Sequence, residues 1–103
     1  MRAAVITGPG GPDVLKIMGG DDPVPGPEDI LVDVRATALN RADTLQRQGG
    51  YPSHPGSSSD ILGLEFAGVV LEAGDRVIGM AKGDRVFGLL GGGGYASRII
   101  THH

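Results

Sequence analysis

The clearest pattern in this chain is an alternation of hydrophobic and polar positions over residues 30–37. Successive side chains of a β-strand point to opposite faces, so the alternation predicts a strand with one face toward a core. The inner face would carry Ile30, Val32, Val34 and Ala36, and the outer face would carry Leu31, Asp33, Arg35 and Thr37.

Two shorter apolar runs precede this strand. Residues 1–7 end at a cluster of glycine and proline, and residues 14–18 follow closely enough to pair with them. Residues 19–29 are rich in proline, glycine and aspartate, so they lack the backbone donors and apolar side chains of an interior strand. We expect this segment to be a surface connection.

The second half of the chain predicts further strands. Residues 61–73 are the most apolar stretch, and the glycines within them favour a bent or bulged central strand over a helix. Shorter apolar runs follow at 77–80 and 85–90, and a new alternation over 95–101 predicts a closing strand.

One helix is predicted, at residues 40–48. Asn40 can cap it, Asp43 can reach back to the cap as in a capping box, and Gly49 can end it. The next segment, residues 49–60, consists mainly of glycine, proline and serine and is predicted to be a mobile loop. Loops of this kind often border functional sites.

Short strands with close turns and a single short helix predict a mainly β domain, either a barrel or a sandwich. The 103 residues suffice for one domain with one small core. No Gly-x-Gly-x-x-Gly motif lies between a strand and a helix, so the sequence contains no dinucleotide-binding β-α-β unit.

Charge and composition exclude several functions. The net charge is −3 and the basic residues are scattered, so no basic stripe is available for nucleic acid. The chain has no cysteine, which excludes disulfides and thiolate metal sites and fits a reducing compartment. No run of about 18 apolar residues marks a membrane span. We expect a cytoplasmic protein that binds neither nucleic acid nor membrane.

Two features have both a functional and a structural interpretation. The glycines at 91–94 could offer backbone donors to a phosphate, but no helix follows them, so a flexible strand connection is favoured. Glu65 lies within an apolar run, where a carboxylate either belongs to a site or lies at a wet edge of the strand. The sequence leaves both interpretations of Glu65 open.

No metal site is predicted from the histidines, which are His54, His102 and His103. Two of them are adjacent and the third lies in a loop, whereas a zinc site needs three or four converging ligands. Asn40 and Asp43 are explained by helix capping alone, which is worth about 1 kcal/mol. Tyr51 could donate a hydrogen bond to a ligand or anchor its loop.

Five segments occur in a fixed order: ATALNRAD at 36–43, QRQGGYP at 46–52, ILGLEFAGVV at 61–70, GDRV at 83–86 and GGGYA at 92–96. Together they resemble the zinc-independent quinone oxidoreductases related to zeta-crystallin, a branch of the medium-chain dehydrogenase/reductase superfamily. The resemblance extends over nearly the whole chain. It implies that residues 1–103 are a GroES-like catalytic domain, a partly open β-barrel with one or two short helices.

The resemblance also bears on metal dependence. Zinc-dependent alcohol dehydrogenases of this superfamily have a cysteine ligand at the position of Asn40 and a histidine ligand at that of Leu64. Both ligands are replaced here, and the cysteine-rich lobe that would follow Val86 is absent. A zinc-independent enzyme is therefore implied.

Complete enzymes of this branch pack the barrel against a Rossmann domain, bind NADPH in the cleft and form homodimers largely through the Rossmann domains. The implied reaction is hydride transfer to a quinone or enone, an activated alkene. Without a metal, hydrogen-bond donors or water must stabilise the developing oxyanion. By position, Asn40 and Tyr51 would be catalytic, and Asn40, Asp43 and Tyr51 would bind the cofactor.

The Rossmann domain is missing from this sequence, so we expect that this chain alone neither binds NADPH tightly nor sustains turnover. The residues that distinguish NADPH from NADH at the ribose 2′ position belong to that missing domain. Two alternatives are a co-chaperonin of similar fold, although residues 49–60 lack an apolar anchor for a partner, and an enoyl-reductase module of a larger synthase.

Overall fold

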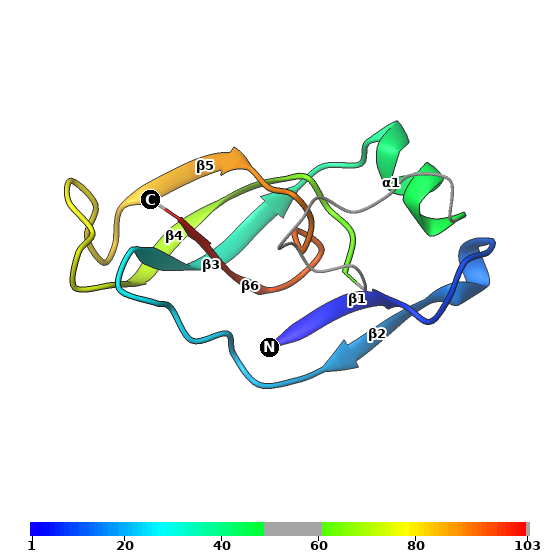
Figure 1. The fold of residues 1–103 in the computed structure, drawn as a ribbon, viewed down its shortest axis with the longest axis horizontal. Helices are drawn as coiled ribbons and strands as arrows, with labels where there is room; N and C mark the ends of the chain where they lie inside the picture. Colours follow the sequence, from blue (N-terminus) through cyan, green and yellow to red (C-terminus); the bar gives the residue numbers. More distant parts are fainter. Residues whose placement is uncertain (49–60, 103) are drawn as a thin grey trace.

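The structure, a computed structural model, describes residues 1–48 and 61–102. Within these residues the chain forms antiparallel strands, one short 3-10 helix and one α-helix (Figure 1). In chain order the elements are β1 (Arg2–Ile6), η1 (Pro12–Val14), β2 (Leu15–Gly19), β3 (Asp29–Thr37), α1 (Arg41–Arg47), β4 (Glu65–Ala73), β5 (Arg85–Leu89) and β6 (Arg98–His102).

The strands form two sheets. β1 and β2 pair as the predicted hairpin, and the other four strands form a sheet in the order β5-β4-β3-β6. Isolated bridges from Ala3 to Ala96 and from Val5 to Ile61 join the hairpin to the rest of the chain. Because β5 and β6 remain edge strands, the sheet does not close, and the predicted mainly β, partly open architecture is confirmed.

The hydrophobic core lies on one face of the four-stranded sheet. Its buried members are Ile30, Val32, Phe66, Val70 and Ile99. The predicted inner face of β3 is correct for Ile30 and Val32, but Leu31, assigned to the outer face, is buried too. β3 is an inner strand between β4 and β6. The extra residue of the register irregularity at Leu31/Val32 is Leu71 on β4, so β3 itself is not bulged there, and Leu31 is buried on the face opposite Ile30 and Val32.

β4 is the bulged central strand that the glycine pattern predicts, although regular pairing begins at Glu65. Its register against β3 shifts twice, at Leu31/Val32 and at Val34/Ala36. A Cβ at Gly68 would lie 2.2 Å from the Asp33 carbonyl oxygen, so only glycine allows β3 and β4 to approach this closely.

Two sequence predictions about strands are wrong. Residues 77–80 form no strand and leave Ile78 85% exposed, in a turn where Gly79 has φ +86°. The closing strand begins at Arg98 rather than at 95, because the backbone of Tyr95 bonds instead to segments outside the sheet. The surface connection at 20–28 and the strand at 85–89 are confirmed.

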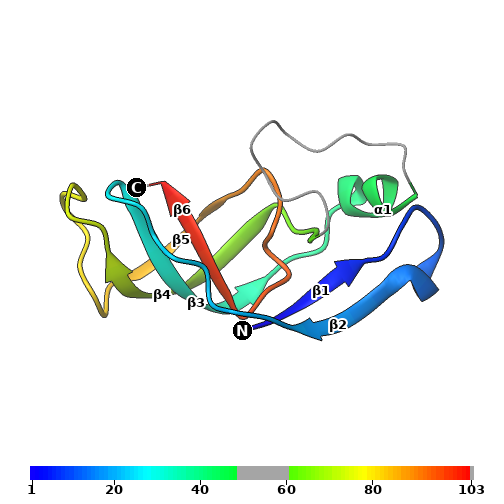
Figure 2. The same ribbon diagram turned by 60° about the horizontal axis from the view of Figure 1, so that its bottom comes forward.

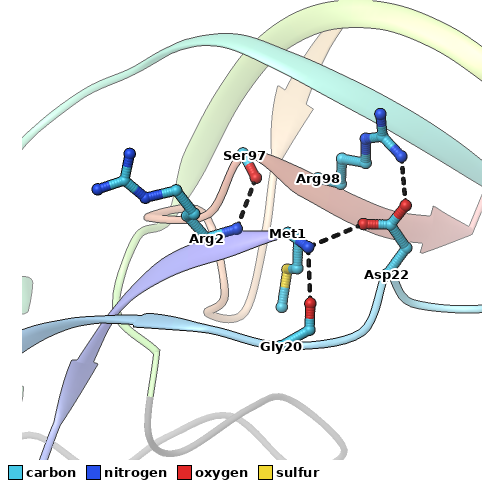
Figure 3. A network of polar contacts seen from close by, with 6 residues as sticks. All are labelled: Met1, Arg2, Gly20, Asp22, Ser97 and Arg98. Atoms are coloured by element: carbon cyan, nitrogen blue, oxygen red, sulfur yellow. Dashed lines mark hydrogen bonds and ion pairs between the residues drawn. The ribbon is translucent and has the colours of Figure 1, made fainter.

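The hairpin is tied to β6 by a polar network (Figure 3). The Met1 ammonium lies 3.1 Å from Asp22 Oδ1, and the other oxygen of Asp22 pairs with Arg98. The Arg2 N–H donates to Ser97 Oγ at 2.9 Å. These contacts hold the start of β1 against the start of β6.

The four-stranded sheet and the helix occupy different parts of the molecule. Figures 1 and 2 show α1 beside the η1 end of the hairpin, at the opposite end of the molecule from the turn between β4 and β5. No helix in the described part of the chain is long and apolar enough to cross a membrane.

Candidate active site

The start of α1 is shaped by two polar residues. Asn40 has an extended backbone (φ −125°, ψ 151°) and caps the helix, and Asp43 completes the predicted capping box. The Asn40 N–H donates to Asp43 Oδ2 at 2.9 Å. The helix ends at Arg47 with Gln48 as its C-cap, and the predicted stop at Gly49 lies outside the described residues.

The far end of α1 is fixed to the loop after β1. The Gly10 N–H donates to the Arg47 carbonyl at 2.9 Å, and Arg47 Nε donates to the Gly10 carbonyl at 3.1 Å. This reciprocal pair orients the helix, so the position of Asp43 depends on contacts at both ends of α1.

Tyr95 approaches Asp43 from a segment 52 residues away, and its phenol donates to Asp43 Oδ2 at 2.5 Å. Its backbone is held by two segments: the Tyr95 N–H donates to Leu62 at 2.9 Å, and its carbonyl accepts from Ala4 at 2.8 Å. Burial, together with the Asp43 carboxylate, raises the pKa of Tyr95 above its ordinary value of 10.0. The phenol therefore remains a protonated donor at neutral pH.

Two buried polar atoms of residues that line one pocket have no partner among the described residues. Asp43 is only 4% exposed and its Oδ1 accepts no hydrogen bond, while Asn40 Nδ2 donates none. Buried polar side-chain atoms in native proteins are nearly always paired. A buried donor and a buried acceptor without partners, on residues three positions apart, indicate a place for a ligand or an ordered water.

These two residues line a pocket of about 250 Å³. Its polar wall includes Asn40, Asp43 and Tyr95, and its apolar wall consists of Leu15, Leu39 and Leu62. Ligand pockets commonly combine apolar walls with a few convergent polar groups. This one is suited to a small group that presents a hydrogen-bond donor and an acceptor together.

The structure does not bring all candidate residues to this pocket. Glu65 is partly exposed at the first position of β4 and lines a different, mainly apolar pocket of about 380 Å³ with Phe66, Phe87 and Leu89. Tyr51, the second predicted catalytic donor, lies outside the described residues. Of the predicted site, Asn40 and Asp43 are therefore the members whose geometry is defined.

The glycine run at 91–94 is not a phosphate loop. Its Gly93 and Gly94 N–H groups donate to Ile61 and Gly63 carbonyls at 2.8 Å and 3.1 Å, so these donors are used within the fold. In residues 1–48 and 61–102, no three histidine, cysteine, aspartate or glutamate side chains gather as metal ligands. His102 contacts Glu28 at 2.8 Å, whereas His54 and His103 fall outside the described residues.

Sequence reasoning missed the contribution of Tyr95. It was predicted only as the first residue of the closing strand. One signal was available: Tyr95 is one of two tyrosines and follows four glycines, which allow a backbone to approach its neighbours closely. The partner, Asp43, was not identifiable from spacing.

An open antiparallel β-domain with a polar pocket beside its one described α-helix is the architecture of a GroES-like domain from a medium-chain dehydrogenase/reductase. The chain belongs to the family described as the alcohol dehydrogenase GroES-like domain, which matches residues 26–103.

Individual relatives extend this likeness. The chain is 41% identical over 104 residues to a quinone oxidoreductase from Lama guanicoe, covering 98% of this chain and 31% of the relative. The structure of a human synaptic vesicle membrane protein VAT-1 homolog-like protein matches with a TM-score of 0.90 and 31% identity, over 99% of this chain and 33% of that one.

A third related structure contains a bound cofactor. The Escherichia coli quinone oxidoreductase complexed with NADPH matches with a TM-score of 0.82 and 32% identity, over 97% of this chain and 30% of that one. The chain thus spans about a third of the length of these relatives. The sequence resemblance to quinone oxidoreductases is confirmed.

Proposed function

We propose that this chain, residues 1–103, is the catalytic-domain portion of an NADPH-dependent, zinc-independent oxidoreductase that transfers hydride to a quinone or an activated alkene. Its family and its likeness to quinone oxidoreductases support this. The observation that carries the proposal is that Asn40 Nδ2 and Asp43 Oδ1, from two residues of one pocket, are buried and have no hydrogen-bond partner among the described residues. In the complete protein the domain works with a Rossmann domain, and the protein is a homodimer in the cytoplasm.

The two free atoms fit a nicotinamide cofactor. A carboxamide carries an acceptor and a donor, and each ribose hydroxyl is both. Asn40 Nδ2 would donate to such a group and Asp43 Oδ1 would accept from it, with Tyr51 as a third contact. When bound, the cofactor supplies the hydride. The buried Leu62 gives the pocket an apolar wall beside these polar atoms.

Asn40 has a further role on the substrate side. Its amide nitrogen carries two hydrogens, so one can donate to the oxygen on which negative charge develops as a quinone or enone is reduced. Tyr51 is the second proposed donor. Asn40 and Leu64 replace two zinc ligands of the related alcohol dehydrogenases, so hydrogen bonding takes over the stabilisation of the oxyanion.

The test uses the full-length protein that carries this domain. We expect it to oxidise NADPH with benzoquinone or a simple enone as acceptor, measured by the loss of NADPH absorbance. Reduction of an enoyl thioester alone would favour the enoyl-reductase module, and assembly into a chaperonin-bound ring would favour a co-chaperonin. Absence of turnover with every acceptor, by folded protein, would contradict the proposal.

Two variants assign the residues. Asn40→Ala should lower kcat by about a hundredfold, the usual effect of removing one oxyanion donor. Tyr51→Phe should weaken NADPH binding and slow turnover, and wild-type values for both would remove Tyr51 from the site. Asp22→Asn, in the surface network that ties the hairpin to β6, is the control and should behave as wild type.

A further inference from the structure

The carboxylate of Asp43 is bonded asymmetrically. Its Oδ2 accepts two hydrogen bonds, from the Asn40 N–H at 2.9 Å and from the Tyr95 phenol at 2.5 Å. Its Oδ1 accepts none from the described residues, although a carboxylate oxygen has two lone pairs. Within residues 1–48 and 61–102, the two donors to this carboxylate therefore hold the same oxygen, and the other oxygen is left for a different partner.

The two donors come from different parts of the chain. The Asn40 N–H belongs to the helix start, whereas Tyr95 lies in the connection before β6. Fixing one oxygen from two directions restricts rotation of the carboxylate about its Cβ–Cγ bond. The orientation of Oδ1 is then set before any ligand binds.

The anchor of Tyr95 is itself rigid. Its N–H and carbonyl bond to Leu62 and Ala4, and the neighbouring Gly63 has φ +112°. A Cβ at Gly63 would lie 2.6 Å from the Tyr95 backbone nitrogen. The 61–64 segment thus packs directly on the backbone of Tyr95, and the position of the phenol follows from main-chain contacts.

We propose that Tyr95 is a positioning residue: it holds Asp43 by Oδ2 and so fixes the direction of Oδ1, which has no partner in the described part of the chain, in the wall of the pocket that Asn40, Asp43 and Tyr95 line. The idea that Asp43 Oδ1 and Asn40 Nδ2 bind the cofactor rests on the proposed function. The contact between Tyr95 and Asp43 is independent of that function. Burial and the Asp43 carboxylate raise the pKa of Tyr95, so the phenol remains a donor to higher pH than an ordinary tyrosine would.

The first test is a double-mutant cycle in the full-length protein, with Tyr95→Phe, Asp43→Asn and the double variant. Tyr95→Phe should raise the KM for NADPH about tenfold, the size expected for a misplaced hydrogen bond to a charged group. In the Asp43→Asn background it should cause no further rise, because Tyr95 acts through Asp43. Wild-type KM in Tyr95→Phe, or effects that multiply, would overturn the proposal.

If Tyr95 had only a structural role, Tyr95→Phe would lower the thermal midpoint without raising the KM for NADPH. The thermal midpoints of all four proteins are therefore measured beside the kinetics. A fall in stability with unchanged KM in Tyr95→Phe also counts against positioning.

The second test needs no cofactor and uses the chain as it is. The sequence has two tyrosines and no tryptophan, so alkaline absorbance reports ionisation of Tyr51 and Tyr95 alone. We expect one phenol to ionise late in the folded wild type, and Tyr95→Phe to remove that late step. Asp43→Asn should shift it to lower pH, with circular dichroism showing that the fold is retained.

Persistence of the late step in Tyr95→Phe, or no shift in folded Asp43→Asn, would overturn the contact. If the full-length protein shows no nicotinamide-dependent turnover, the proposed function fails. This titration still decides whether Tyr95 holds Asp43.

Discussion

Two aspartates of this domain join distant segments in opposite ways. Asp43 is 4% exposed and is held by neutral donors, the Asn40 N–H and the Tyr95 phenol, with one oxygen left free among the described residues. Asp22 has a side chain 39% exposed, and both its oxygens face cations, the Met1 ammonium and Arg98.

The difference shows what burial does to a carboxylate. Exposed ion pairs contribute little to stability, because water and salt screen them. A buried group left unsatisfied costs a large part of its desolvation free energy. We therefore interpret Asp22 as a surface tie between the hairpin and β6, and Asp43 as part of a site that is completed by a ligand.

The largest effect is expected from the segment that supports Tyr95. Gly63→Ala would place a Cβ within 2.8 Å of three backbone atoms of Gly94 and Tyr95, at a positive φ. We expect it to lower the free energy of unfolding by about 3 kcal/mol or more, from strain and overpacking together. Urea denaturation measures this.

Gly83→Ala is the matched control. Gly83 also has a positive φ, +94°, but a Cβ there meets nothing within 4 Å. It should cost only about 1 kcal/mol, from backbone strain alone. Equal losses for the two variants would mean that the 61–64 segment does not pack on Tyr95 as described.

Asp43→Ala comes next and addresses the comparison directly. It removes the acceptor of two hydrogen bonds, one from the Tyr95 phenol and one from the Asn40 N–H that forms half of the capping box, so we expect a loss of about 2–3 kcal/mol. Asp22→Ala should be clearly less destabilising in the same urea experiment. If the two variants cost the same, burial does not distinguish these aspartates.

Tyr95→Phe should cost about 1 kcal/mol at neutral pH, because one hydrogen bond is lost with little change in packing. The folded pKa of Tyr95 is raised, so its stabilising contribution is complete below the ordinary value of 10.0. It is lost as the pH rises above 10.0 toward the folded pKa. The unfolding free energy of wild type should therefore fall toward that of Tyr95→Phe in alkaline buffer.

The smallest effect belongs to Asp22→Asn. The hydrogen bond from the Met1 ammonium lowers the pKa of Asp22 below 3.8, and Arg98 adds to this. Its contribution is thus present above pH 3.8 and is lost as the pH falls through the lowered folded pKa. We expect a small loss at low salt that vanishes at high salt, and a salt-independent loss would contradict a surface ion pair.

Much of the fold was predictable because it is encoded locally. Alternation identified β3, a capping pattern identified α1, and glycines within an apolar run predicted the bulges of β4. The errors arose where tertiary contacts override local pattern. Leu31 is buried in an inner strand, and the backbone of Tyr95 is taken up by Leu62 and Ala4 before β6 begins.

The candidate site was predictable only in part. Family resemblance directed attention to Asn40 and Asp43, but capping alone accounts for both residues at the sequence level. The structure adds that each residue lines a pocket and has a buried polar atom with no partner in the part of the chain that is described. The contact between Tyr95 and Asp43 spans 52 residues, and no local pattern reports a contact of that kind.

The most direct test compares the two aspartates in cofactor binding. NADPH is titrated calorimetrically into the full-length protein as wild type, Asp43→Asn and Asp22→Asn, each of which exchanges one carboxylate oxygen for an amide nitrogen. The account predicts that Asp43→Asn raises the Kd about tenfold and that Asp22→Asn leaves it unchanged. An unchanged Kd in folded Asp43→Asn would show that the pocket beside α1 does not face the cofactor.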